Sequence, residues 1–229
     1  MTDPAVRALI DAASIRYRPA GRFAWYFARV KLAGDPAFAA ILRRGLLSDR
    51  ARILDLGCGQ GLLAAWLLAA EAKQLEGGWP RDWPPAPAPR QLLGVDVDRR
   101  EVARARTALG DRARFVHDDI RHVDYGSVDA IVLLDVLHYT DRPSQEAVLS
   151  RARAALAPHG VLLLRIGDAE GGAAFALSKL VDRTVALARR HELPRLACRP
   201  APRLTEQPLG SPDRVGRAGR DVSGQLARG

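Results

Sequence analysis

The segment Ile53-Leu54-Asp55-Leu56-Gly57-Cys58-Gly59-Gln60-Gly61 decides the fold. Its first part, with Arg52 before it, is a short and mostly apolar run of the kind that forms a strand buried on both faces. Three glycines at alternate positions follow, where a backbone without Cβ atoms can turn sharply and let a ligand approach. A helix is predicted from Gly61 to about Ala72. The segment therefore predicts a strand, a ligand-binding turn and a helix in direct succession.

The spacing of the glycines argues against two common phosphate-binding loops. A dinucleotide loop of the form Gly-x-Gly-x-x-Gly would need glycine at position 62, which is Leu62, because the third glycine is Gly61. No Gly-Lys-Ser/Thr sequence follows, so the Walker pattern is absent as well. A nicotinamide-dependent (NAD) oxidoreductase is thus a disfavoured alternative.

Strands and helices alternate along the rest of the chain. Strands are predicted at 52–56, 91–97, 113–117, 128–134 and 161–166, and helices at 61–72, 98–109, 142–156 and 172–191. With right-handed crossovers, this alternation predicts a doubly wound, mostly parallel α/β sheet. Ligands bind such sheets at the carboxyl ends of the strands, so we expect the functional residues there.

Three helices are predicted before the first strand, at 4–14, 22–33 and 36–44. In the second helix the spacing places four apolar residues on one face, namely Phe23, Tyr26, Phe27 and Val30. Asp35 is expected to cap the third helix, with Pro36 at its first position. Residues 73–90, rich in Pro, Gly and Trp, are predicted to form a long surface insertion without helix or central strand.

The composition favours a soluble, cytoplasmic protein. Hydrophobic residues make up 48% of the 229, but no apolar run reaches the ~18 residues that cross a bilayer, and no signal peptide is evident. The net charge is +9, and nearly all of the basic residues are Arg. A GC-rich genome produces such a composition without selection for binding, so nucleic acid is not an expected partner. Cys58 and Cys198 are too few for a disulfide framework or a zinc cluster, and no metal is predicted.

Acidic residues follow the second and third predicted strands. Asp96 ends the second strand, where a carboxylate can accept hydrogen bonds from two hydroxyl groups of a ligand. Asp98 is better placed to cap the following helix. Asp118 and Asp119 follow the third strand.

Over roughly residues 50–170 the glycine segment and the order of elements closely resemble class I S-adenosylmethionine-dependent methyltransferases. The resemblance implies a Rossmann-like fold, S-adenosyl-L-methionine as the cofactor and a methylation reaction. It also implies a loop that wraps the methionine and ribose portions of the cofactor, formed by Asp55, Gly57, Cys58, Gly59 and Gly61.

The same resemblance assigns the other cofactor contacts. Asp96 would accept the ribose hydroxyls, and Val97 would pack on the adenine. Asp119 would accept from the adenine amino group while Ile120 packs on the ring, with Asp118 as the alternative to Asp119.

The segment after the fourth strand would face the transferable methyl group. The Leu134 carbonyl and Asp135 would lie near the positively charged methionine end of the cofactor. His138 is a candidate general base, although it is equally well explained as a loop histidine bonded to backbone. Tyr139 would pack on the substrate or on the core.

Two absences narrow the expected chemistry. Positions 135–138 lack the Asn/Asp-Pro-Pro-Tyr/Phe pattern of enzymes that methylate amino groups of nucleic acids and glutamine, and no cysteine lies near the fourth strand. Direct displacement remains, in which the protein aligns donor and acceptor and excludes water. The overall resemblance to bacterial methyltransferases, some of them associated with lipid or aryl-polyene pathways, implies methyl transfer to a small molecule, phenolic or from a lipid pathway.

The resemblance also organises the chain into three parts. These are an N-terminal helical lid at 1–48, with Phe23, Trp25, Tyr26 and Phe27 over the site, a cofactor-binding domain at 49–194 and an Arg/Pro/Gly-rich tail at 195–229. The family ordinarily has two further strands, but no strand pattern follows Pro194, so we expect a truncated or disordered C-terminal end. A protein that holds the cofactor but is catalytically impaired is therefore an alternative.

Overall fold

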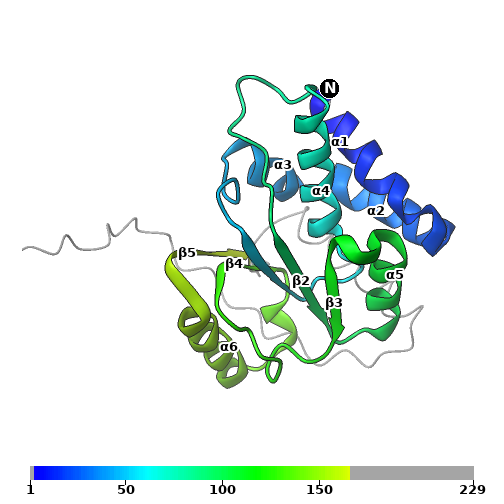
Figure 1. The fold of residues 1–229 in the computed structure, drawn as a ribbon. Coiled ribbons are helices and arrows are strands. Elements are labelled where there is room, and N and C mark those ends of the chain that lie inside the picture. The colour runs from blue at the N-terminus through cyan, green and yellow to red at the C-terminus, as the bar shows by residue number, and fades with distance from the viewer. Residues whose placement is uncertain (1–2, 166–229) are drawn as a thin grey trace, which may run out of the picture.

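A parallel sheet of five strands forms the centre of the protein (Figure 1). The computed structural model describes residues 3–165. The strand order is β3-β2-β1-β4-β5. The strands are β1 Arg52–Leu56, β2 Gln91–Asp96, β3 Arg114–His117, β4 Val128–Leu134 and β5 Leu156–Arg165. The order reverses beside β1, as in doubly wound folds, and the predicted α/β fold class is confirmed.

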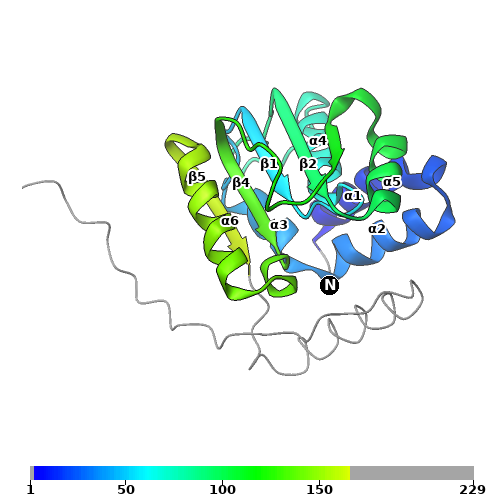
Figure 2. The ribbon, with the colours of Figure 1, turned by 90° about the horizontal axis from the view of Figure 1, so that it is seen from below.

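Helices cover both faces of the sheet, as Figure 2 shows. The α-helices are α1 Pro4–Ser14, α2 Arg22–Gly34, α3 Pro36–Arg43, α4 Leu62–Leu75, α5 Arg99–Leu109 and α6 Arg142–Ala155. Short 3₁₀ turns are η1 Ile15–Ala20, η2 Gly110–Arg112 and η3 Leu137–Tyr139. Buried residues of α1 to α5 share one core cluster, whereas α6 packs in a second cluster on the opposite face. The connections through α4 and α5 run from β1 toward β3, whereas the connection through α6 runs from β4 to β5 on the other side of β1, so right-handed crossovers place these helices on opposite faces.

The side chains of β1 alternate between these two cores. Ile53 belongs to the cluster with α4 and α5, while Leu54 and Leu56 belong to the cluster with α6. Because successive side chains of a strand point to opposite faces, Asp55 points to the same face as Ile53. A carboxyl group therefore enters the core on the side of the N-terminal helices.

Three of the four residues that the spacing places on one face of α2 point outward. Phe23, Tyr26 and Val30 are 52%, 51% and 69% exposed, and the buried residues of α2 are Ala24, Ala28 and Leu32. The small alanines let α2 pack closely against η1 and α1. Phe23 lies instead beneath the guanidinium of Arg104, 4.8 Å from its ring centroid.

The insertion rich in Pro and Trp is a packed segment at the amino ends of the strands. Residues 76–90 contain neither helix nor strand, as predicted, although α4 extends to Leu75 and so past the predicted end. Trp79 and Trp83 meet edge to face at 5.4 Å, and the Trp79 Nε1–H donates to the Pro84 carbonyl at 2.8 Å. The segment connects α4 to the start of β2, so it lies away from the carboxyl edge of the sheet.

The start of β5 also differs from the sequence prediction. β5 begins at Leu156 and not at residue 161, because Leu156 already pairs with Val128 before an irregularity shifts the ladder. His159, within this irregular part, has a φ of 64°. The predicted helix at 172–191 and the predicted tail at 195–229 lie outside the described residues. No helix within residues 3–165 is long and apolar enough to cross a membrane.

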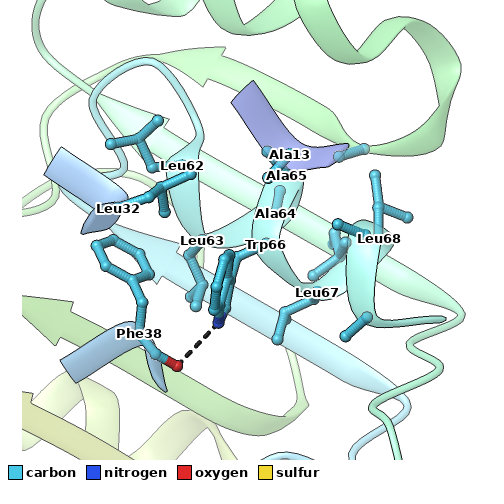
Figure 3. Close-up of a cluster of buried hydrophobic side chains, with 14 of the residues drawn as sticks. Ala13, Leu32, Phe38, Leu62, Leu63, Ala64, Ala65, Trp66, Leu67 and Leu68 are labelled. Atoms are coloured by element: carbon cyan, nitrogen blue, oxygen red, sulfur yellow. Dashed lines mark hydrogen bonds between the residues drawn. The ribbon is translucent and has the colours of Figure 1, made fainter. Parts of the chain in front are cut away.

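The centre of the larger core is α4, whose residues 62–70 are all buried (Figure 3). Trp66 is fully buried, and its Nε1–H donates to the Phe38 carbonyl of α3 at 2.8 Å. This contact ties the N-terminal helices to the helix that follows the glycine turn.

We predict that Trp66→Phe lowers the free energy of unfolding by about 1–3 kcal/mol, because it removes a buried hydrogen bond and opens a cavity. Trp25→Phe is the matched control, since the Trp25 Nε1–H has no hydrogen-bond partner among the described residues. Trp25→Phe should lose less unfolding free energy than Trp66→Phe, as measured by urea unfolding followed by circular dichroism. Equal losses in the two variants would contradict the role given to the Phe38 bond.

Candidate functional site

The candidate site is the carboxyl edge of the sheet, where the turn at 57–61 follows β1. Gly57, Gly59 and Gly61 have φ values of 76°, 53° and 78°, in the left-handed region that favours glycine. A Cβ on Gly57 would come within 2.3 Å of Val136, and one on Gly61 within 2.7 Å of Phe115. A Cβ on Gly59 would meet nothing within 4 Å. Close packing therefore requires Gly57 and Gly61, whereas Gly59 borders open space that a ligand can enter.

Asp96 joins this turn to the end of β2. Its Oδ2 accepts from the Gly59 N–H and its Oδ1 from the Asp98 N–H, both at 2.8 Å. The Val95 carbonyl accepts from the N–H groups of Gly57 and Cys58 at 2.8 and 3.0 Å. A carboxylate oxygen can accept more than one hydrogen bond, so Asp96 keeps acceptor capacity for a ligand.

Two ionisable groups of the turn are buried. Asp55 is only 9% exposed, and burial together with the charge of Asp96 raises its pKa to about 7. Burial also raises the pKa of the Cys58 thiol, as do the neighbouring carboxylates Asp55 and Asp96. Cys58 is therefore a neutral thiol packed in the core, which suits a structural role and not that of a nucleophile.

The N-terminal helices contact the turn through Tyr17 and Gln60, two residues that the sequence analysis missed. Tyr17 is fully buried, and its hydroxyl donates to the Gln60 carbonyl at 2.9 Å. The Gln60 side-chain amide donates to the Ala24 carbonyl of α2, also at 2.9 Å. The one available signal was a polar Gln between two glycines in an otherwise buried segment. Nothing local in the sequence pointed to Tyr17.

The aromatic residues predicted to form a lid have mixed positions. Trp25 is partly buried, and the Arg18 guanidinium lies 5.0 Å from its ring centroid. Phe23 stacks on Phe27 at 6.1 Å, whereas Tyr26 is half exposed. Their role as a lid stays a prediction.

The acids after β3 are engaged within their own loop. The Asp118 Oδ1 accepts from the Asp119 N–H at 2.7 Å, and the Asp119 carboxylate pairs with Arg121 at 2.6 Å. The hydrogen bond from Arg121 lowers the pKa of Asp119. Ile120 is buried in the core beside α6, whereas Val97 is 63% exposed. The adenine contacts assigned to Val97, Asp119 and Ile120, with Asp118 as the alternative, stay predictions.

An ion-pair network lies where β4 ends. Leu134 pairs with Arg165 in the sheet, and Asp135 follows in the left-handed region with a φ of 58°. Arg165 Nε donates to Asp135 Oδ1 at 2.9 Å, and Arg165 Nη2 donates to Asp35 Oδ2 at 2.7 Å. Asp35 also caps α3, as predicted, through the Ala37 N–H. Burial alone would raise the pKa of Asp35, but the bonds and charge of Arg165 lower it below its usual value.

His138 and Tyr139 lie together in η3, which follows this network. Their ring centroids are 4.1 Å apart, with the rings tilted by 44°. Tyr139 is 42% exposed. The predicted catalytic residues Asp135, His138 and Tyr139 thus occupy one short segment, but their roles stay predictions. Within residues 3–165 no group of His, Cys, Asp or Glu side chains is arranged to hold a metal ion.

We predict that Asp55 makes stability depend on pH. Because the pKa of Asp55 in the folded protein is about 7, above an unfolded value of about 3.9, the folded state binds the proton more tightly. The resulting stabilisation is complete below pH ~4 and is lost as the pH rises through ~7. Asp55→Asn should therefore be more stable than the wild type at pH 8, by on the order of 2–4 kcal/mol.

Urea titrations from pH 4 to 8 measure this effect. Asp124→Asn, at an exposed turn, is the control for losing one carboxylate and should keep the wild-type slope. An Asp55→Asn protein with an unchanged pH slope would show that Asp55 is ionised in the fold throughout this range.

Comparison with known proteins identifies a domain in this part of the chain. Residues 54–162 match a family described as a methyltransferase domain. A carboxy-S-adenosyl-L-methionine synthase of Chromohalobacter salexigens is 37% identical over 140 residues, covering 56% of this chain and 47% of the relative. A synthase of the same name from Glaesserella parasuis is 27% identical over 129 residues, covering 54% of this chain and 48% of the relative. The chain thus spans about half the length of the curated relatives that it matches.

Solved structures overlap the fold in part. CalS10, an amino pentose methyltransferase from Micromonospora echinaspora with bound S-adenosylmethionine, is 24% identical, with a TM-score of 0.38. That alignment covers 57% of this chain and 48% of the other.

Proposed function

We propose that this chain, whose residues 54–162 match a methyltransferase domain, is a class I S-adenosylmethionine-dependent methyltransferase, which binds S-adenosyl-L-methionine at the carboxyl edge of its sheet and transfers the methyl group to a small molecule. The observation that carries the proposal is the turn at 57–61 joined to Asp96 through the Gly59 N–H. This arrangement presents a backbone without a side chain beside a carboxylate at the edge where such sheets bind ligands.

The residues of this edge fit the proposed cofactor. Open space at Gly59 allows a ligand to approach the backbone closely. Asp96 has remaining acceptor capacity for the two ribose hydroxyls, and the exposed side chain of Val97 offers an apolar surface for the adenine. Asp135 lies at the end of β4, on the side proposed for the methionine portion.

The bound cofactor supplies a methyl group that is already activated by a positively charged sulfur. The protein then has to hold the acceptor in line and exclude water. A phenolic hydroxyl, with a pKa of about 10, would have to lose its proton during transfer, and His138 is the residue proposed to take it. Tyr139, whose ring is tilted against that of His138, would pack against the acceptor. An acceptor from a lipid pathway is the alternative to a phenolic acceptor in this proposal.

A second function follows from the relative that is 37% identical over 140 residues, a carboxy-S-adenosyl-L-methionine synthase. On that proposal the product is a carboxylated form of the cofactor and not a methylated acceptor. A third outcome is cofactor binding without turnover. The NAD-dependent alternative is further weakened because Leu62, buried at the start of α4, occupies the position that its loop needs as glycine.

We predict that Asp96→Asn weakens binding of S-adenosylhomocysteine by about 1–3 kcal/mol, because the amide loses one acceptor and the negative charge. Asp98→Asn removes the same charge two residues away while keeping the cap of α5, so it should bind like the wild type. Isothermal titration calorimetry measures both, with NAD as the negative ligand. Unchanged affinity in Asp96→Asn would refute the ribose assignment, and preference for NAD would refute the proposed cofactor.

The two proposed reactions give different products. Wild-type protein incubated with S-adenosylmethionine and a small-molecule cell extract should release S-adenosylhomocysteine if it transfers methyl groups. Mass spectrometry would instead detect the cofactor enlarged by a carboxyl group if it is a synthase. We predict the first result, and His138→Ala should reduce release at least tenfold for an acceptor that must lose a proton, as about 10²–10⁴-fold is typical of a general base. Carboxylated cofactor alone would exclude methyl transfer as the activity.

A further inference from the structure

Gln60 is the residue through which the cofactor turn contacts the N-terminal helices. It lies between Gly59 and Gly61, both in the left-handed region, and is 1% exposed. Its carbonyl accepts from the Tyr17 hydroxyl, and its side-chain amide donates to the Ala24 carbonyl. One residue of the turn is thus held both by η1 and by the first turn of α2.

The opposite side of the turn is held by β2. Asp96 accepts from the Gly59 N–H, and the Val95 carbonyl accepts from Gly57 and Cys58. A turn with three left-handed glycines has little intrinsic conformational preference, because glycine is the residue with the most freedom to lose on folding. The geometry that a ligand meets at Gly59 is therefore set by contacts from both sides.

Tyr17 is held in place by the residues that surround it, so its hydrogen bond to the Gln60 carbonyl has a fixed geometry. The side chain is fully buried, and η1 packs against α5, on the face where Asp55 enters the core. A buried hydroxyl without a partner would be destabilising, and the Gln60 carbonyl is the partner that it has. Replacing Tyr by Phe removes this bond while keeping the ring, so the packing of η1 is preserved.

We propose that the segment 15–28 is part of the cofactor site and that Tyr17 is a positioning residue, which acts by fixing Gln60 and thereby the turn at Gly59. The inference rests on the proposed binding of S-adenosylmethionine. Without the Tyr17 bond the turn samples more conformations, and a ligand has to order it on binding. By linkage, a ligand that orders the turn also strengthens the contacts of the turn with residues 15–28.

Two variants and a control test this proposal with S-adenosylhomocysteine as the probe. Tyr17→Phe removes the hydroxyl, and Gln60→Met removes the amide donor along with a buried Oε1 that has no hydrogen-bond partner among the described residues. Trp79→Phe is the control, because it also deletes a bond to a backbone carbonyl but lies in the segment 76–90. Calorimetry gives affinity, thermal unfolding gives stability, and hydrogen exchange of residues 15–28 is measured with and without ligand.

We expect Tyr17→Phe and Gln60→Met each to weaken binding about fivefold, the equivalent of one hydrogen bond of ~1 kcal/mol. Ligand should slow exchange of residues 15–28 in the wild type and less in both variants. Trp79→Phe should lower stability without changing affinity or protection. A loss of stability alone in Tyr17→Phe would mean that the contact is only structural.

The result separates this inference from the proposed function. If the wild type binds the probe but the variants bind equally well, with unchanged protection of residues 15–28, the positioning role is wrong and cofactor binding stands. If the wild type does not bind the probe, the proposed cofactor is wrong and this inference fails with it.

Discussion

The hydrogen bond from the Gly59 N–H to Asp96 is the contact on which the site depends. It is a bond between a neutral donor and a carboxylate, a kind that is stronger than bonds between neutral groups. Ordering the backbone costs about 1–2 kcal/mol per residue and more for glycine. A turn with three glycines in five residues therefore needs external restraints, which come from Asp96, from the Val95 carbonyl and from Gln60 and its partners. Open space at Gly59 and a single fixed conformation can thus coexist.

The same edge concentrates negative charge in a chain whose formal net charge is +9. Asp55 is buried near Asp96, and the pKa of Asp55 rises to about 7 as a result. Such a group is unfavourable for folding near neutral pH. Features that lower stability in this way are expected at functional sites. A positively charged ligand beside these carboxylates would favour their ionised forms. The arrangement suits a cationic cofactor better than a pyrophosphate, whose charges would be repelled.

Local patterns in the sequence predicted the elements that depend on neighbouring residues. The apolar runs of β1 and β4, the caps at Asp35 and Asp98 and the glycine turn were all found in this way, because each signal lies within a few residues of its effect. The partners of Gln60 and Arg165 could not be found, since Tyr17 is 43 positions from Gln60 and Asp35 is 130 from Arg165. The outward orientation of the aromatic face of α2 does not follow from the spacing of its apolar residues. Periodicity reports which residues are apolar, whereas close packing of helices selects for small ones such as Ala24 and Ala28.

The N-terminal helices reach both halves of the candidate site. Tyr17 and Ala24 contact the glycine turn, while Asp35 reaches Asp135 through Arg165. Lys31 also lies 3.3 Å from Asp35, so two cations face two carboxylates in this network. Removing one member of a buried ion pair is more damaging than never having formed it, because an unpaired charge stays behind. The glycine turn and the end of β4 therefore share one support, and a displacement of α2 and α3 would affect both sides of the candidate site.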